Sequence, residues 1–146
     1  MTTISNLANA FLSLEPMTNK KLQKLCYYAK ALHLALYDEN IIAEPFEAWI
    51  HGPVCRQLYD RYKTYGKNAI DKELVEVDTS NDLMVFVHQI YDAYGHLTDD
   101  ELEIVTHREE PWIEARGDSE PLQSCEESIS EDTMKSYYRG KYLNVS

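Results

Sequence analysis

The 146-residue sequence lacks any apolar run near the ~20 residues that a membrane-spanning helix needs, so we expect no membrane partner. The opening stretch, MTTISNLANAFLSLEP, lacks the basic start of a secretory signal peptide. Cysteine is also scarce. Cys26, Cys55 and Cys125 are odd in number and far apart, which argues against a disulfide framework. These absences together predict a cytoplasmic protein with reduced thiols.

Common nucleotide-binding and hydrolase motifs are missing as well. The chain contains no GxxxxGKS/T loop, no GxGxxG, no HExxH and no GxSxG. The five histidines are scattered along the chain: His33, His51, His88, His96 and His107. His88 and His96 could share a helical face, but no third metal ligand is evident. The sequence therefore predicts neither a metal nor a cofactor.

Cysteine chemistry is the enzymatic alternative that the residues leave open. Cys26 and Cys55 fall on predicted apolar faces, which indicates buried and unreactive thiols. Cys125 is followed by two glutamates, whose charge disfavours a thiolate. We expect the chain not to be an enzyme. A nucleophilic pair of Cys55 with His51, four residues away, stays an alternative.

The net charge of −11 is distributed unevenly. Residues 1–70 hold eight Lys/Arg against six Asp/Glu, a net charge of +2. Residues 71–146 hold six Lys/Arg against nineteen Asp/Glu, a net charge of −13. The second half should repel nucleic acid, so we expect no direct nucleic-acid partner, and it should attract basic proteins. Solubility alone is the simpler explanation of the same charge.

The longest helical pattern runs from Thr18 to Tyr37, with Thr18 as a candidate N-cap. Its apolar stripe follows the 3.6-residue period. The stripe consists of Leu22, Leu25, Cys26, Ala29, Leu32, His33 and Leu36. We expect this helix to bury the stripe and the other helices to pack around it.

The remaining patterns predict several shorter elements. Helical spacing, caps and Gly/Pro stops place helices at 4–14, 53–65, 83–94, 98–108 and 130–140, with a turn at 112–116. Thr98 and Glu101 have the form of a capping box. The predicted fold class is mainly α: a compact, single-domain bundle of five or six helices over residues 1–146. A short extended element is expected near residues 46–51, with a candidate one at 74–77.

Three blocks of sequence stand out because they combine charged and aromatic residues. They are KLQKLCYYAKALHLAL in the 20–36 region, EAWIHGPVCRQLYDRYKTYG at 47–66, and THREEPW at 106–112. The lysines at the start of the long helix, Lys20, Lys21 and Lys24, suit either a solvated face or a partner-binding surface. Trp49 in the second block suits either a wedge that closes the core or a contact surface.

The three blocks, in this order, resemble the Panacea domain of phage-associated, SocA-like antitoxins. The resemblance covers about residues 4–140. The first block matches the family pattern at Lys21, Leu22, Lys24, Leu25, Tyr27, Tyr28 and Ala29. The second and third match it at Glu47, Ala48, Trp49, Gly52, Pro53, Val54, Thr106, His107, Pro111 and Trp112.

The resemblance implies a mostly helical antitoxin from a bacterial or prophage toxin–antitoxin operon. It implies a cognate protein toxin as the partner, which members of the family neutralise by direct binding. Some of these toxins resemble small alarmone synthetases and modify tRNA. One related antitoxin type instead delivers its toxin to a AAA+ protease, which is the alternative function. No catalytic residues are implied.

The resemblance also supplies the candidate partner-binding residues. They are Lys21, Lys24, Tyr27, Tyr28, Glu47, Trp49, Gly52, Pro53, Thr106, His107, Pro111 and Trp112. We expect the Leu face of the long helix to hold the fold and its Lys/Tyr face to shape the contact. A toxin that handles tRNA needs a basic surface, which the acidic second half could cover.

Overall fold

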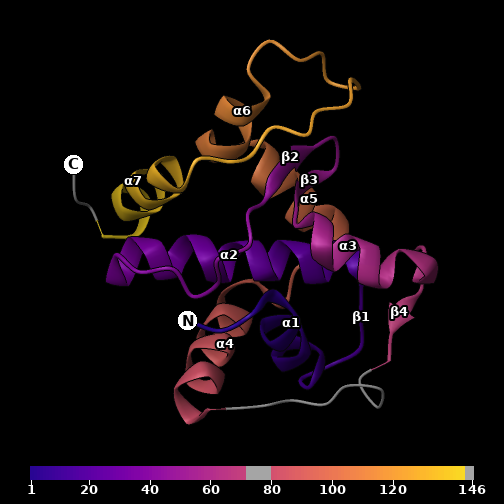
Figure 1. Ribbon diagram of the computed structural model, residues 1–146, viewed down its shortest axis with the longest axis vertical. Coiled ribbons are helices and arrows are strands. Elements are labelled where there is room, and N and C mark those ends of the chain that lie inside the picture. The colour runs from indigo at the N-terminus through magenta and orange to yellow at the C-terminus, as the bar shows by residue number, and fades with distance from the viewer. Residues whose placement is uncertain (72–79, 144–146) are drawn as a thin grey trace.

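The computed structural model describes residues 1–71 and 80–143. This part of the chain contains seven α-helices: α1 (Ile4–Leu12), α2 (Asn19–Tyr37), α3 (Arg56–Tyr62), α4 (Asn81–Tyr94), α5 (Asp99–His107), α6 (Glu110–Arg116) and α7 (Glu131–Leu143) (Figure 1). The mainly α fold class is confirmed, whereas the predicted five or six helices are too few. The additional helix is α6. Pro111 sits in its first turn, where the missing N–H is not needed.

Helix α2 runs through the middle of the molecule (Figure 1). Helices α1 and α4 lie on one side of it, and α3 and α5 lie on the other, with α7 beside its C-terminal half. Thr18 is the N-cap, as predicted, and its hydroxyl accepts from the Lys21 N–H at 3.2 Å. The helix ends at Asp38, whose φ of 56° is left-handed and whose N–H donates to the Leu34 carbonyl.

The predicted apolar stripe of α2 is buried only in its N-terminal part. Its buried members are Leu22, Leu25, Cys26 and Ala29. Leu36 is instead 43% exposed, while Leu34 and Ala35 are buried. The reason is that α7 packs against the side that carries Ala35, where Arg139 Nε donates to the Ala35 carbonyl at 2.9 Å. Tertiary packing thus turns the buried face away from the stripe.

Two small antiparallel sheets complete the described fold. Strand β1 (Met17–Thr18) pairs with β4 (Ala69–Ile70), and β2 (Glu47–Trp49) pairs with β3 (Gly52–Val54). The extended element expected near residues 46–51 is confirmed by β2, whereas the candidate at 74–77 lies outside the described residues. The helix predicted from Pro53 is wrong at its start. Pro53 lies in β3, and α3 begins only at Arg56, followed by a 3-10 helix, η1 (Lys63–Tyr65).

The C-terminal helix α7 is longer than its sequence pattern predicts. Gly140 lies inside α7 instead of ending it. Met134 and Tyr138 are buried, and Tyr137 is half-buried. The segment before α7 is tied to the hairpin, because the Ile129 N–H donates to the Phe46 carbonyl at 2.7 Å. This hydrogen bond therefore links the segment before α7 to the residue that precedes the β2–β3 hairpin.

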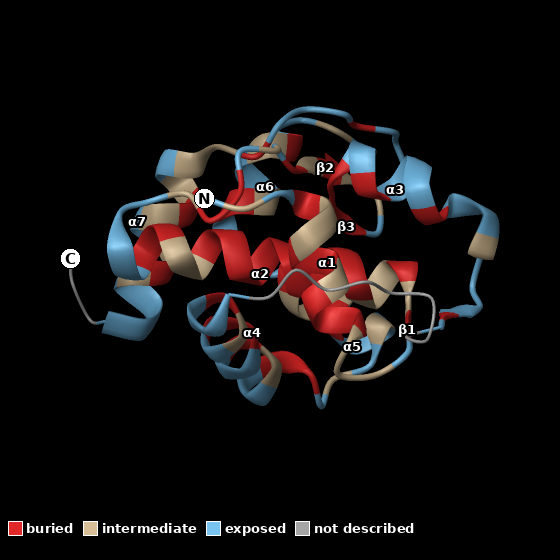
Figure 2. Cartoon of the chain, turned by 60° about the horizontal axis from the view of Figure 1, so that its bottom comes forward, coloured by how far each residue is buried: buried red, intermediate tan, exposed pale blue. Residues whose placement is uncertain are grey.

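Buried side chains gather around α2. Figure 2 shows them on α2 itself and on the sides of the surrounding helices that face it, while the outer sides of α4 and α7 are exposed. The buried apolar cluster includes residues from α1 through α7. The predicted capping box is present, with the Thr98 and Glu101 side chains each accepting from the other's backbone N–H. None of the helices in the described ranges is long and apolar enough to cross a membrane.

Candidate partner-binding site

One residue from each of the three sequence blocks meets at a single point beside α2. Lys24 Nζ donates to the Pro53 carbonyl at 3.3 Å. Gly52, the first residue of β3, has a φ of 110°, which side chains rarely adopt. A Cβ on Gly52 would lie 2.7 Å from Lys24 Cε and 2.9 Å from Thr106 Oγ1. The hairpin therefore approaches α2 and α5 so closely that only glycine fits.

The two tryptophans join the second block to the third. Trp112 Nε1 donates to the Trp49 carbonyl at 2.8 Å. The His107 ring stacks on Trp112 with centroids 4.0 Å apart and planes 13° apart. Burial lowers the pKa of His107, which favours a neutral imidazole at pH 7. Pro111 is buried in the first turn of α6. These contacts hold α6 against the hairpin.

A buried carboxylate, Glu109, joins the first block to the third. Its Oε1 accepts from the Tyr28 hydroxyl at 2.6 Å and from the Tyr138 hydroxyl at 2.8 Å. Its Oε2 accepts from Lys141 Nζ at 2.7 Å. Sequence reasoning missed Glu109, although it lies inside the THREEPW block. Its position between two helices and near aromatic residues was a sequence signal, because a carboxylate that is buried there needs hydrogen-bond donors.

Aromatic rings surround this carboxylate. Tyr28 stacks on Tyr94 with centroids 4.0 Å apart and planes 9° apart. Tyr27 contacts Phe46 and Tyr138 edge to face. Burial raises the pKa of Tyr28 and of Tyr27, so both hydroxyls stay protonated and can donate. The two tyrosines of the first block are therefore parts of the packed interior.

The expected outward Lys/Tyr face of the long helix is wrong for three of its four residues. Lys24, Tyr27 and Tyr28 are buried, because the hairpin, α4 and α7 cover α2 on several sides. Burial and the nearby charge of Lys20 lower the pKa of Lys24 to about 7. Lys21 is half-buried, and its Nζ contacts Glu15 Oε1 at 3.1 Å and the Gly95 carbonyl at 2.7 Å. These residues shape the fold rather than a free surface.

One accessible part of the motif region is the hairpin surface, formed by half-buried Trp49 and by exposed His51, Arg56 and Tyr59. Arg56 lies over the Trp49 ring at 5.3 Å, and the Tyr59 ring meets Trp49 edge to face at 4.9 Å. His51 is exposed, with Nδ1 3.2 Å from Glu103. Beside this surface lies a hollow of about 250 Å³. Its lining is Trp49, Ile50, His51, Val54, Ser124, Cys125 and Glu126.

Ion pairs fix the side chains of the hairpin surface. Arg56 contacts Glu47 at 3.1 Å and Glu126 at 3.0 Å. Glu47 is half-buried, and its Oε1 also accepts from Trp49 Nε1 at 2.8 Å. The guanidinium is thus held over the indole by carboxylates on two segments. Such a pre-positioned aromatic–arginine pair is typical of protein-binding surfaces.

The Cys55 thiol and the His51 imidazole lie in different surroundings. Cys55 is buried, and burial raises the pKa of its thiol, while exposed His51 faces Glu103. Cys26 is buried as well, and burial raises its pKa. Across residues 1–71 and 80–143, no group of three or more His, Cys, Asp or Glu side chains could hold a metal ion.

Comparison with known proteins found one matching family. Residues 22–113 match the family described as antitoxin SocA-like, Panacea domain. A search of curated proteins and a search of solved structures each found no match. The matched range includes Lys24, Gly52 and Thr106, which meet beside α2, and Glu109, which lies among its tyrosines. The chain therefore belongs to the family of SocA-like antitoxins with a Panacea domain.

Proposed function

We propose that this chain is a cytoplasmic antitoxin of a bacterial or prophage toxin–antitoxin system, acting as one domain that neutralises its toxin by direct binding. The match of residues 22–113 to the antitoxin family carries the proposal. The buried cluster extends beyond both ends of that match, from α1 to α7, which supports one domain over residues 1–146. The three cysteines are free and buried, as suits a reducing compartment.

The hairpin surface is the proposed contact for the toxin. Most other motif residues are enclosed in the junction of α2, the hairpin and α6, so they cannot touch a partner directly. Arg56 and His51 remain exposed. Trp49 is half-buried beneath Arg56, which leaves a rigid aromatic base for a partner side chain.

The negative charge of residues 71–146 supports the proposal that the toxin is basic. Exposed carboxylates border the hairpin surface on the loop before α7, among them Glu126 and Glu127. A toxin that modifies tRNA must present positive charge to the phosphate backbone. An acidic antitoxin would approach that charge quickly and could cover it. The proposed partner is therefore a basic, tRNA-binding toxin.

Co-expression with the toxin from the neighbouring gene tests the proposal. The wild-type chain should restore growth and copurify with the toxin. The double variant His51→Ala/Arg56→Ala should lose both effects. The matched variant Lys67→Ala/His88→Ala, which removes an exposed cation and an exposed histidine elsewhere, should keep them. Failure of the wild type to rescue growth or bind would refute direct neutralisation.

The same experiment separates direct neutralisation from delivery to a AAA+ protease. A neutralising antitoxin leaves the toxin present in a stable complex. An adaptor makes the toxin disappear, and its loss depends on the protease. Toxin levels measured by immunoblot in strains with and without the protease distinguish these outcomes. Unchanged toxin levels, together with copurification, would exclude the adaptor.

A further inference from the structure

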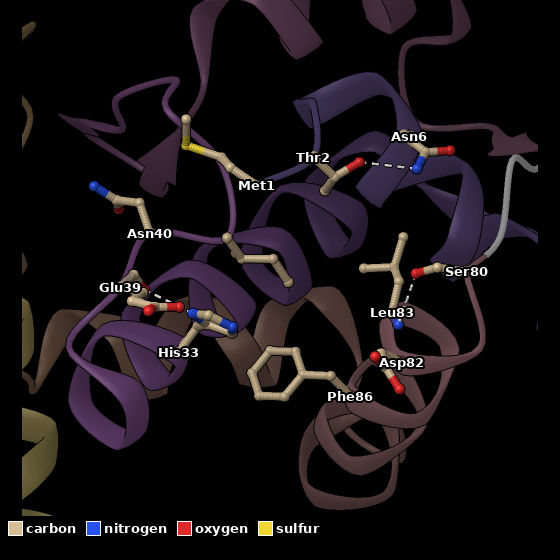
Figure 3. A pocket seen from close by; sticks show the side chains of 11 residues that line it. Met1, Thr2, Asn6, His33, Glu39, Asn40, Ser80, Asp82, Leu83 and Phe86 are labelled. Atoms are coloured by element: carbon tan, nitrogen blue, oxygen red, sulfur yellow. Dashed lines mark hydrogen bonds between the residues drawn. The ribbon is translucent and has the colours of Figure 1, made fainter.

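A second surface lies away from the hairpin, between the C-terminal part of α2 and helix α4. Two adjoining hollows of about 420 Å³ and 550 Å³ occur there. They share four lining residues: His33, Glu39, Asp82 and Phe86. Figure 3 shows the first hollow, with His33 of α2 beside Phe86 of α4 and with Leu83 and Asp82 on the same helix as Phe86. We name the combined depression the α2–α4 groove.

The groove combines a buried apolar floor with an exposed apolar wall. Phe86 and Leu83 are buried, and the His33 ring contacts Phe86 edge to face at 5.2 Å. Tyr37 and Val85 line the outer hollow and are 55% and 51% exposed. Large apolar side chains in one open depression are a usual feature of sites that receive another apolar side chain.

The charged groups of the groove are mostly acidic. Glu39 and Asp82 are exposed and line both hollows, whose described lining contains no lysine or arginine. Besides these two carboxylates, the lining contains His33 and Met1, whose imidazole and α-amino group can carry positive charge. Within the described residues, neither Glu39 nor Asp82 forms an ion pair, whereas neighbouring Asp38 pairs with Lys135 at 2.5 Å. Among the described residues, the two carboxylates beside the apolar wall therefore have no lysine or arginine partner.

We propose that the α2–α4 groove binds a partner segment in which an apolar side chain is flanked by lysine or arginine. The apolar side chain packs on Phe86, Tyr37 and Val85, and the cations meet Glu39 and Asp82. This inference rests on the proposed function, since it gives the toxin a second point of attachment. A second copy of this chain is a poorer occupant, because its own net charge of −11 opposes self-association.

An NMR titration of the full-length chain tests the groove without needing the toxin. The probe is a 12-residue, end-capped peptide of lysine and leucine in a helical repeat. Two comparison peptides replace lysine by glutamate or leucine by serine. Backbone amide shifts should change around His33, Val85 and Phe86 with the Lys/Leu peptide alone. Raising NaCl from 50 to 500 mM should weaken that binding at least about fivefold.

Two pairs of variants give matched controls. Val85→Ser should weaken peptide binding at least about threefold, whereas Ile104→Ser, a change at an equally exposed aliphatic residue on α5, should not. Glu39→Gln/Asp82→Asn should weaken it similarly. Asp92→Asn/Asp118→Asn, which removes two exposed charges outside the groove, should have little effect. All these positions are exposed, so folding should survive.

Three results would overturn the proposal. The first is peptide shifts that map to the hairpin surface or to the acidic loop instead of the groove. The second is equal binding by the groove variants and their controls. The third is a dimer by light scattering whose interface is the groove. A wild-type chain that binds the peptide in the groove but fails to neutralise the toxin would refute the proposed function alone.

Discussion

Lys24 is buried although its sequence surroundings favour exposure. Its place among lysines at the start of a helix favours a solvated position. In the fold its whole side chain is buried beside Gly52 and Thr106. Gly52 and Thr106, which cover Lys24, are about 30 and 80 residues away in the sequence. The helical periodicity around Lys24 contains no information about such distant contacts.

Substitution of Lys24 tests this burial. Lys24→Glu should lower the free energy of unfolding by about 3 kcal/mol or more, because it places a carboxylate where a carbonyl already lies. Lys24→Met keeps the volume without a charge and should be close to neutral. Urea denaturation measures both. A Lys24→Glu variant as stable as the wild type would contradict the burial.

The titration of Lys24 predicts a pH dependence. Its pKa is lowered by burial from 10.5 to about 7 in the fold, whereas the unfolded chain keeps the ordinary value. Between those values the unfolded state binds more protons, so the free energy of unfolding rises with pH. Relative to Lys24→Met, the wild type should gain on the order of 2 kcal/mol from pH 7 to pH 9. Parallel pH curves for the two proteins would argue against this shift.

Glu109 is buried, whereas its neighbour Glu110 is exposed, so substitutions at the two positions should differ in their effect on stability. Glu109→Ala should cost about 3 kcal/mol of unfolding free energy, since it leaves Tyr28 and Tyr138 without their acceptor. Glu110→Ala changes an exposed glutamate and should cost well under 1 kcal/mol. Chemical denaturation of both variants measures the difference. Similar losses in the two would show that the Glu109 network contributes little.

At the scale of elements, predictability follows the range of the interactions. Thr18 and the Thr98–Glu101 capping box were predictable, because a cap depends on residues three positions away. The hairpin strand at Pro53 and the burial of Lys24 were not, because they depend on pairing with Ala48 and on contact with α5. Of the candidate site, the sequence indicated the three blocks, but only packing shows which members stay exposed.

Helix α7 contains a glycine that should lower its stability. Gly140 lies exposed inside α7, although glycine there favours a helix end. Gly140→Ala should therefore raise the free energy of unfolding by about 0.5–1 kcal/mol, since alanine is the better helix former. Thermal unfolding followed by circular dichroism measures this gain. A lower Tm for the variant would indicate that the helix stops at Gly140.

For the whole molecule, the distribution of charge determines which partners it attracts from a distance. The first half is close to neutral, and the second half holds nineteen of the twenty-five acidic residues. A protein charged in this way attracts basic partners over a distance comparable with the Debye length, about 8 Å at physiological salt. The hairpin surface and the α2–α4 groove would act after that encounter.

The association rate with the toxin should consequently depend on salt. Between 50 and 500 mM NaCl the rate constant should fall at least about fivefold, because screening removes the long-range attraction. Stopped-flow mixing of the purified proteins measures the rate. A rate constant that does not change with salt would remove the proposed role of the acidic half.

The chain is proposed to inhibit its toxin by binding alone. Isothermal titration calorimetry of the purified chain with the purified toxin tests this claim without protease or ATP. Under direct neutralisation, binding should saturate at a fixed stoichiometry, and toxin activity should be lost at the same ratio. Absence of binding, or a toxin that stays active at saturation and is lost only when a AAA+ protease and ATP are added, would contradict it.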